Sequence, residues 1–124
     1  IGCSDCHTPE VDGIAGVYSD FLLYSLEDHE ISTGYTQELE VPMPSHLPEP
    51  DEWQTPPLWG VADSAPYFHD GKSATLEDAI FRHKGAAKHV MKRHKQLQSS
   101  DKEAVLEFLK SLRAPKTAEL LVAR

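Results

Sequence analysis

Cysteine, aromatic residues and long apolar runs are all scarce in this 124-residue sequence, and each shortage excludes a class of protein. With only two cysteines, the chain cannot form a disulfide framework or a four-cysteine zinc site. No apolar run is long enough to cross a bilayer, so we expect no membrane span. Aromatic residues make up 8%, which is little for a protein-only core, and the length predicts a single domain over residues 1–124.

The two cysteines lie in one short motif, Cys3-Ser4-Asp5-Cys6-His7. Cys-x-x-Cys-His is the attachment signature of a c-type haem. The spacing lets one helical turn present both thiols to the porphyrin edge, where they become thioethers. His7 follows directly and is placed to bind the iron as the proximal ligand. We therefore expect one covalent haem c, held by Cys3, Cys6 and His7, and a haem that supplies much of the apolar core.

Two other chemistries also use a Cys-x-x-Cys pair. Zinc would need two further ligands, which the seven histidines leave formally possible. A thioredoxin-like redox pair would need a preceding strand, but only Ile1 and Gly2 precede Cys3. Haem fits the context better. Because this group is attached outside the cytoplasm, we expect a periplasmic or otherwise extracytoplasmic protein. The short segment before Cys3 suggests a processed N-terminus or a preceding domain.

Charge is divided sharply along the chain. Residues 1–71 carry 14 acidic residues and no Lys or Arg, a formal charge of −14. Residues 72–124 carry all 12 basic residues and 6 acidic ones, a charge of +6, which gives the net −8. The division either only solvates a small domain or forms a dipolar surface that orients the haem edge toward a charged redox partner. The basic half is also rich in apolar helix-face residues, so we expect no nucleic-acid binding.

Helix and loop signals predict an all-α, cytochrome c-like haem domain with a few short helices and long proline-rich loops. Seven of the nine prolines fall within residues 42–66, where they exclude long helices and central strands. Ser19 or Asp20 is expected to cap a short helix over the apolar residues that follow. No strand pair is evident.

The second half of the chain holds the clearest helix signals. Thr75 and Asp78 form a capping-box pattern, and Gly85 is a plausible C-cap of the helix they open. Further helices are predicted near residues 86–95 and from about Ser100, where Glu103 completes a second capping box. The apolar face of the first of these helices carries, at helical spacing, Leu76, Ala79, Ile80 and His83.

The other axial ligand of the iron would decide what the haem does. Met43, in a Met-Pro pair, is either a distal sulfur ligand or an apolar loop anchor. His83 is either a core histidine of the predicted helix or a ligand. His69 either orients its turn or bonds a haem propionate. The remaining candidates are expected to be exposed, rim or solvated residues, and they are Met91, His29, His46, His89 and His94.

Four runs of the sequence are informative when they are taken together. They are Glu-Trp-Gln-Thr-Pro-Pro-Leu-Trp-Gly at 52–60, Tyr-Phe-His-Asp-Gly at 67–71, Thr-Leu-Glu-Asp-Ala-Ile at 75–80, and the closing helix at 106–112. The set resembles the C-terminal haem domain of the bacterial di-haem cytochrome c peroxidase and MauG superfamily, and most of all its di-haem, thiol oxidoreductase-like branch. The resemblance extends from Gly2 to about Pro115.

The resemblance implies a role for His83. In the peroxidases, a methionine five residues after the position of Asp78 is the distal ligand, and related oxidoreductases have a histidine there. This favours ligation by His7 and His83, with Met43 as the alternative. The sequence departs from the family pattern at Gln54, where arginine is common, and at Tyr24, where related sequences tend to have histidine.

The family's catalytic haem belongs to another domain, whereas this sequence has one haem motif. The resemblance therefore implies an electron-transfer cytochrome whose partner is a redox protein or a further haem domain or subunit. The alternative is a haem peroxidase or related oxidoreductase with an open or labile distal position.

Overall fold

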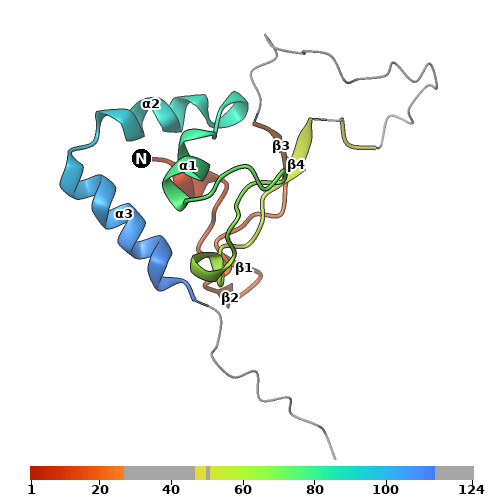
Figure 1. Ribbon diagram of the computed structural model, residues 1–124. Coiled ribbons are helices and arrows are strands. Elements are labelled where there is room, and N and C mark those ends of the chain that lie inside the picture. The colour runs from red at the N-terminus through yellow and green to blue at the C-terminus, as the bar shows by residue number, and fades with distance from the viewer. Residues whose placement is uncertain (27–46, 50, 114–124) are drawn as a thin grey trace, which may run out of the picture.

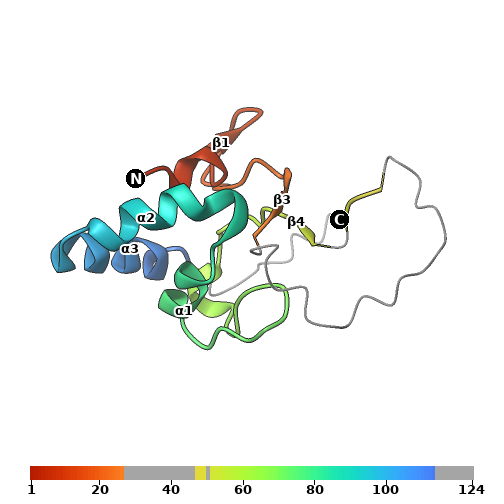
Figure 2. The same ribbon diagram turned by 90° about the horizontal axis from the view of Figure 1, so that it is seen from above.

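The computed structural model describes residues 1–26, 47–49 and 51–113, and in this part of the chain the expected all-α class is wrong. Three α-helices are accompanied by two antiparallel sheets of two strands each, so the fold is mixed α and β. Figures 1 and 2 show the helices gathered on one side and the β3–β4 pair on the other.

The first sheet is a tight hairpin of β1 (Glu10–Val11) and β2 (Ile14–Ala15). Its two loop residues, Asp12 and Gly13, both have positive φ angles, of 50° and 80°. Such a pair of left-handed residues matches the twist of a two-residue hairpin, and Asp-Gly is a preferred sequence for it. The hairpin therefore follows from its local sequence, although no strand pair was predicted.

The second sheet joins distant parts of the chain. β3 (Leu23–Ser25) pairs with β4 (Glu52–Gln54), and Tyr24 lies opposite Trp53. The helix expected after Ser19 or Asp20 is absent, because both side chains bond to nearby backbone instead. Ser19 Oγ accepts from the Phe21 N–H at 2.9 Å, and Asp20 Oδ1 accepts from the Leu22 N–H at 2.9 Å. Bonds of this kind compete with helix formation.

The predicted capping box at Thr75 is confirmed. Thr75 Oγ1 accepts from the Asp78 N–H, and Asp78 Oδ2 accepts from the Thr75 N–H, both at 3.1 Å. The helix α1 (Leu76–Phe81) is shorter than expected, because Arg82 caps it and His83 lies just beyond its end. Gly85 is not its C-cap but opens the 3-10 turn η4 (Gly85–Ala87).

Two longer helices follow in the described chain. α2 (Lys88–Gln96) and α3 (Ser99–Ser111) confirm the two further helices. The second capping box is wrong, because α3 begins after Gln98 without a side-chain cap bond. α3 packs against α1 and against the 3-10 turn η3 (Val61–Asp63).

The described chain buries few hydrophobic side chains and several polar ones. Val17 and Met91 are its buried hydrophobic side chains, whereas large ones such as Trp59 remain 59% exposed. Fully buried Ser19 donates its hydroxyl proton to the Thr55 carbonyl at 2.7 Å, so a polar bond fastens the 17–22 segment to the chain near β4. The described prolines of the 42–66 stretch lie in irregular chain around β4 and η3, as the loop prediction requires, and they are Pro48, Pro56, Pro57 and Pro66.

Candidate haem site

The 3-10 turn η1 (Cys3–Asp5) carries the first part of the cysteine motif. The backbone N–H groups of Cys6 and His7 both donate to the Cys3 carbonyl, the second at 2.9 Å. The three motif side chains are therefore held within one compact turn. The short helix expected here is confirmed, although it spans only three residues.

His7 has its ring fixed by a backbone carbonyl. Its Nδ1 lies 3.0 Å from the Tyr18 oxygen, so the ring N–H donates to that carbonyl and Nε2 is left for a metal. Burial lowers the pKa of His7, although the bond to Tyr18 opposes the shift, so the ring is neutral near pH 7. A neutral imidazole is the form that binds a metal.

The Tyr18 carbonyl is itself held in place. Tyr18 has a φ of 52° and lies between the buried residues Val17 and Ser19. Both of these neighbours are bonded to other segments: Val17 O accepts from Leu58 N–H and Ser19 N–H donates to Thr8 O, each at 3.1 Å. This contact could not be predicted from the sequence, because it depends on the direction of a backbone carbonyl.

His83 repeats the arrangement from the far end of α1. Its Nδ1–H donates to the Ala79 carbonyl at 2.8 Å, and its backbone N–H donates to Ile80 O at 3.1 Å. Burial lowers the pKa of His83, so this ring too is neutral near pH 7. The last turn of α1 thus holds the ring with Nε2 unused by these bonds.

The rings of His7 and His83 are neighbours, with centroids 6.4 Å apart and planes inclined by 58°. A metal–imidazole bond is about 2 Å and a ring centre lies roughly 1 Å behind its nitrogen, so two rings sharing one metal have centres about 6 Å apart. The separation therefore suits two axial ligands of one iron. Residues 76 positions apart in sequence reach this spacing through unrelated elements.

The two thiols do not resemble a redox-active pair. Cys3 is exposed, Cys6 is half-buried, and no disulfide joins them. Burial raises the pKa of both thiols, whereas reactive Cys-x-x-Cys pairs have a lowered one. Beside Cys6, the Tyr24 hydroxyl donates to Asp20 at 2.7 Å, which raises the pKa of Tyr24.

The other ligand candidates do not join this pair in the described chain. Met43, His29 and His46 lie outside the described residues. His89 is exposed as expected, 4.0 Å from Asp5. Met91 and His94 were expected at the surface, but both are buried in α2, because the helix turns them toward its neighbours.

His69 and Phe68 occupy the turn that the resemblance included. The His69 ring stacks on Trp53 with centroids 3.8 Å apart. Phe68 meets the His83 ring edge-on at 5.5 Å, a contact that sequence reasoning missed. The Tyr-Phe-His-Asp-Gly run is the only sequence signal for this contact, and it predicted a role for His69 and its turn but none for Phe68.

The residues present fit a c-type haem: two thiols, two neutral imidazoles with free Nε2 atoms, and apolar side chains left at the surface. The described residues contain no cluster of three or more His, Cys, Asp or Glu side chains that could hold a metal ion. The zinc alternative therefore gains no support there. Within the same residues, no helix has the length and apolar character to cross a membrane.

Comparison with known proteins agrees with this chemistry. The family described as "Di-haem oxidoreductase, putative peroxidase" matches residues 1–112. No curated protein and no solved structure gives a significant match. A match over nearly the whole chain, on top of a haem-binding donor set, shows that the chain belongs to the di-haem oxidoreductase family.

Proposed function

We propose that this chain is an electron-transfer c-type haem domain in which His7 and His83 are the two axial ligands and Cys3 and Cys6 are the thioether anchors. The observation that carries the proposal is the pair of imidazoles 6.4 Å apart, each with Nδ1–H directed to a carbonyl. The match to an oxidoreductase family named for its haems supports it independently.

His7 and His83 would hold the haem iron, and the group would supply a one-electron couple of lower potential than a histidine–methionine pair would give. The protein's task is to keep both rings in place in both redox states. Tyr18 and Ala79 accept the Nδ1 protons of the two ligands, which fixes their tautomers and their orientation. Burial lowers the pKa of both rings, which favours the neutral form that binds a metal.

The family name speaks of two haems, while this sequence has one Cys-x-x-Cys-His motif. We therefore place the second haem in a further domain or subunit, with which this domain exchanges electrons. The covalent attachment implies an extracytoplasmic, periplasmic setting. The peroxidase chemistry in the family description belongs, on this proposal, to the other haem.

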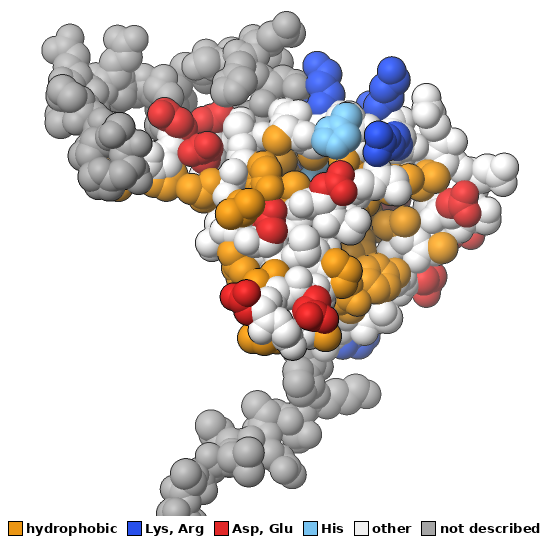
Figure 3. Space-filling view, turned by 180° about the vertical axis from the view of Figure 1, so that it is seen from behind, with side chains coloured by type: hydrophobic (Ala, Val, Ile, Leu, Met, Phe, Trp, Pro, Cys, Tyr) orange, Lys and Arg blue, Asp and Glu red, His pale blue; other side chains and the backbone are white. Residues whose placement is uncertain are grey.

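A basic surface on α2 fits the docking of an acidic partner. α2 lies against η1, since Arg93 reaches the Ile1 carbonyl at 3.5 Å and His89 lies 4.0 Å from Asp5. Figure 3 shows Lys, Arg and His side chains gathered along one edge of the molecule. The exposed members of this α2 basic surface are Lys88, His89, Lys92, Arg93 and Lys95.

The test is spectroscopic. The full chain, produced with haem-attachment machinery, is expected to show a low-spin, six-coordinate spectrum in both redox states and to bind carbon monoxide only slowly. His83→Ala should become high-spin and bind carbon monoxide rapidly. His89→Ala, which removes an exposed histidine, is the matched control and should behave as wild type.

Two results would contradict the proposal. A near-infrared methionine-to-iron band that vanishes only in Met43→Ala would replace His83 with Met43. Rapid carbon monoxide binding by the wild type would favour the peroxidase-like alternative with an open distal position.

A further inference from the structure

We propose that Arg82 is a positioning residue for His83: it clamps the 67–73 loop to the end of α1 and, through Phe68, fixes the orientation of the His83 ring. The inference rests on the proposed function, because the orientation of His83 matters most if its Nε2 binds iron. Four contacts of the Arg82 guanidinium group support it.

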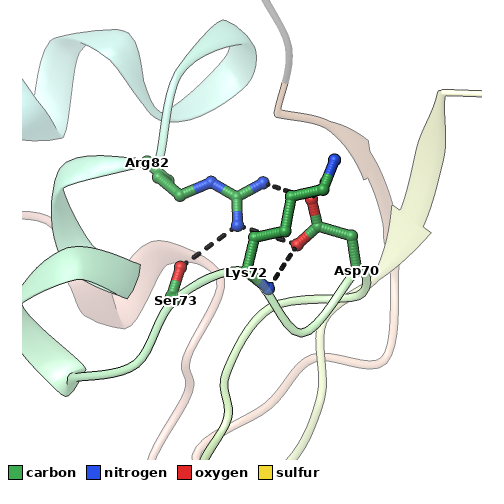
Figure 4. Close-up of polar contacts among 4 residues, drawn as sticks. All are labelled: Asp70, Lys72, Ser73 and Arg82. Atoms are coloured by element: carbon green, nitrogen blue, oxygen red, sulfur yellow. Dashed lines mark hydrogen bonds and ion pairs between the residues drawn. The ribbon is translucent and has the colours of Figure 1, made fainter.

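Arg82 holds the loop by a forked ion pair. Its two terminal nitrogens donate to Asp70 Oδ1 and Oδ2, each at 2.8 Å, and Nη1 also donates to Ser73 Oγ at 3.1 Å (Figure 4). Arg82 and Asp70 are only 33% and 20% exposed, and Ser73 is fully buried. A two-pronged pair is more directional than a surface ion pair that makes a single contact. The guanidinium accordingly keeps the pKa of Asp70 well below its usual range.

The clamped loop is closed at its base and strained near its start. Tyr67 and Ser73 exchange backbone hydrogen bonds of 2.7 and 3.3 Å. Between them, Phe68 has a φ of 71°, in a region that bulky residues rarely adopt. A conformation of this kind persists only where surrounding contacts impose it. The Asp70 and Ser73 bonds to Arg82 are such contacts.

Phe68 links the clamp to the ligand. The Arg82 Cζ atom lies 4.3 Å from the centre of the Phe68 ring, in cation–π contact. The same ring meets His83 at 5.5 Å with an interplanar angle of 89°. Phe68 is therefore held by Arg82 and in turn limits rotation of the imidazole.

His83 has one side-chain hydrogen bond of its own, from Nδ1 to Ala79 O. That bond orients the ring through one edge only, at Nδ1. The Phe68 contact supplies the second restraint, and Arg82 secures it from the adjacent position in the chain. Lysine cannot replace this function, because it lacks both the planar fork and the flat stacking surface.

The experiment compares Arg82→Gln, Arg82→Lys and Asp70→Asn in the haem-loaded full chain. We expect Arg82→Gln to bind carbon monoxide about tenfold faster than wild type after reduction, since the released ring leaves the iron more often. Arg82→Lys should not restore the wild-type rate, and Asp70→Asn should lie between. The low-spin electron paramagnetic resonance signal, which reports the orientation of axial rings, should broaden or split in the same order.

Arg113→Gln is the matched control, because Arg113 also pairs with an aspartate, Asp63, but does so beyond α3. Equal carbon monoxide rates in wild type, Arg82→Gln and Asp70→Asn would overturn the inference, as would an equal effect of Arg113→Gln. If Arg82→Gln does not fold, Arg82→Lys and Asp70→Asn decide the matter alone. A wild type that is already high-spin would overturn the proposed ligation and the inference together, whereas a low-spin wild type with unaffected variants would overturn the inference alone.

Discussion

Three histidine side chains of the described chain are withdrawn from solvent, and their nitrogens have different partners. His7 and His83 each donate one N–H to a carbonyl. His94 is 4% exposed, packs edge-on against Phe81, and has a buried Nδ1 without a hydrogen-bond partner. The bonds of His7 and His83 suit metal ligands. His94 is instead a core residue, and its burial disfavours the protonated form.

The lowered pKa of His94 predicts that the stability of the fold depends on pH. Burial lowers its pKa below the usual value of 6.5, Lys102 on α3 lowers it further, and Glu77 on α1 opposes both. Below about pH 6.5 the unfolded chain therefore takes up a proton more readily than the folded chain, and the free energy of unfolding falls as the pH falls. Above that value the effect is absent.

Urea unfolding between pH 7 and 5 measures this effect. His94→Leu should lose less stability over the interval than wild type, because it has no proton to bind. His89→Gln, which changes an exposed histidine, should follow the wild-type curve. Identical pH dependence in wild type and His94→Leu would contradict the prediction.

Single residues of the site differed in how far they could be foreseen. Cys3, Cys6 and His7 were evident because their spacing alone encodes the chemistry. His83 was placed near the end of a capped helix, and the family resemblance singled it out. Tyr18 and Phe68 were missed as parts of the site, because a carbonyl direction and a left-handed phenylalanine arise only when distant segments pack.

Among the elements, α1 has the most direct bearing on the site, since its last turn holds His83. The helix is only six residues long, too short to persist on its own, so its cap contributes a large share of its stability. Its beginning could be predicted from a local side-chain pattern. Its end could not, because the C-cap residue, Arg82, pairs with Asp70 from a separate loop.

Thr75→Ala should lower the free energy of unfolding by about 1 kcal/mol, because it removes the hydroxyl that caps the Asp78 N–H. Thr75→Ser should retain most of the stability. Ser100→Ala tests the other proposed cap and should have little effect, since α3 begins without a side-chain cap bond. Denaturant unfolding distinguishes these outcomes, and an equal loss at both positions would contradict the capping account.

The strands mark the limit of local prediction. The β1–β2 hairpin has a local signal in Asp12-Gly13, a preferred two-residue hairpin turn, which the predicted all-α class did not include. The β3–β4 pair had none, because Leu23–Ser25 and Glu52–Gln54 are far apart in sequence and their pairing depends on the tertiary fold. The predicted all-α class is therefore wrong for two reasons: one hairpin turn at Asp12-Gly13 and one strand pair between distant segments.

At the scale of the whole molecule, the division of charge along the chain predicts how fast the protein reacts with small charged oxidants. Exchanging Lys88 and Lys92 for Glu should slow oxidation of the reduced protein by ferricyanide several-fold at low ionic strength, because the anion loses its attraction to the α2 basic surface. High salt should abolish the difference. Lys110→Glu, on α3 and paired with Glu107, is the control. If Lys110→Glu slowed the oxidation equally, the α2 basic surface would not be the docking site.

The pairing of β3 with β4 also bears on how this family can diverge. Ser25 donates its hydroxyl proton to Asp51 at 2.7 Å, and Lys84 N–H donates to Leu26 O at 3.2 Å, so the chain on either side of residues 27–50 is fastened at its base. Lengthening a connection whose ends are already joined changes the closure entropy only logarithmically. Insertions and deletions there should accumulate among relatives while the spacing of the two imidazoles stays the same.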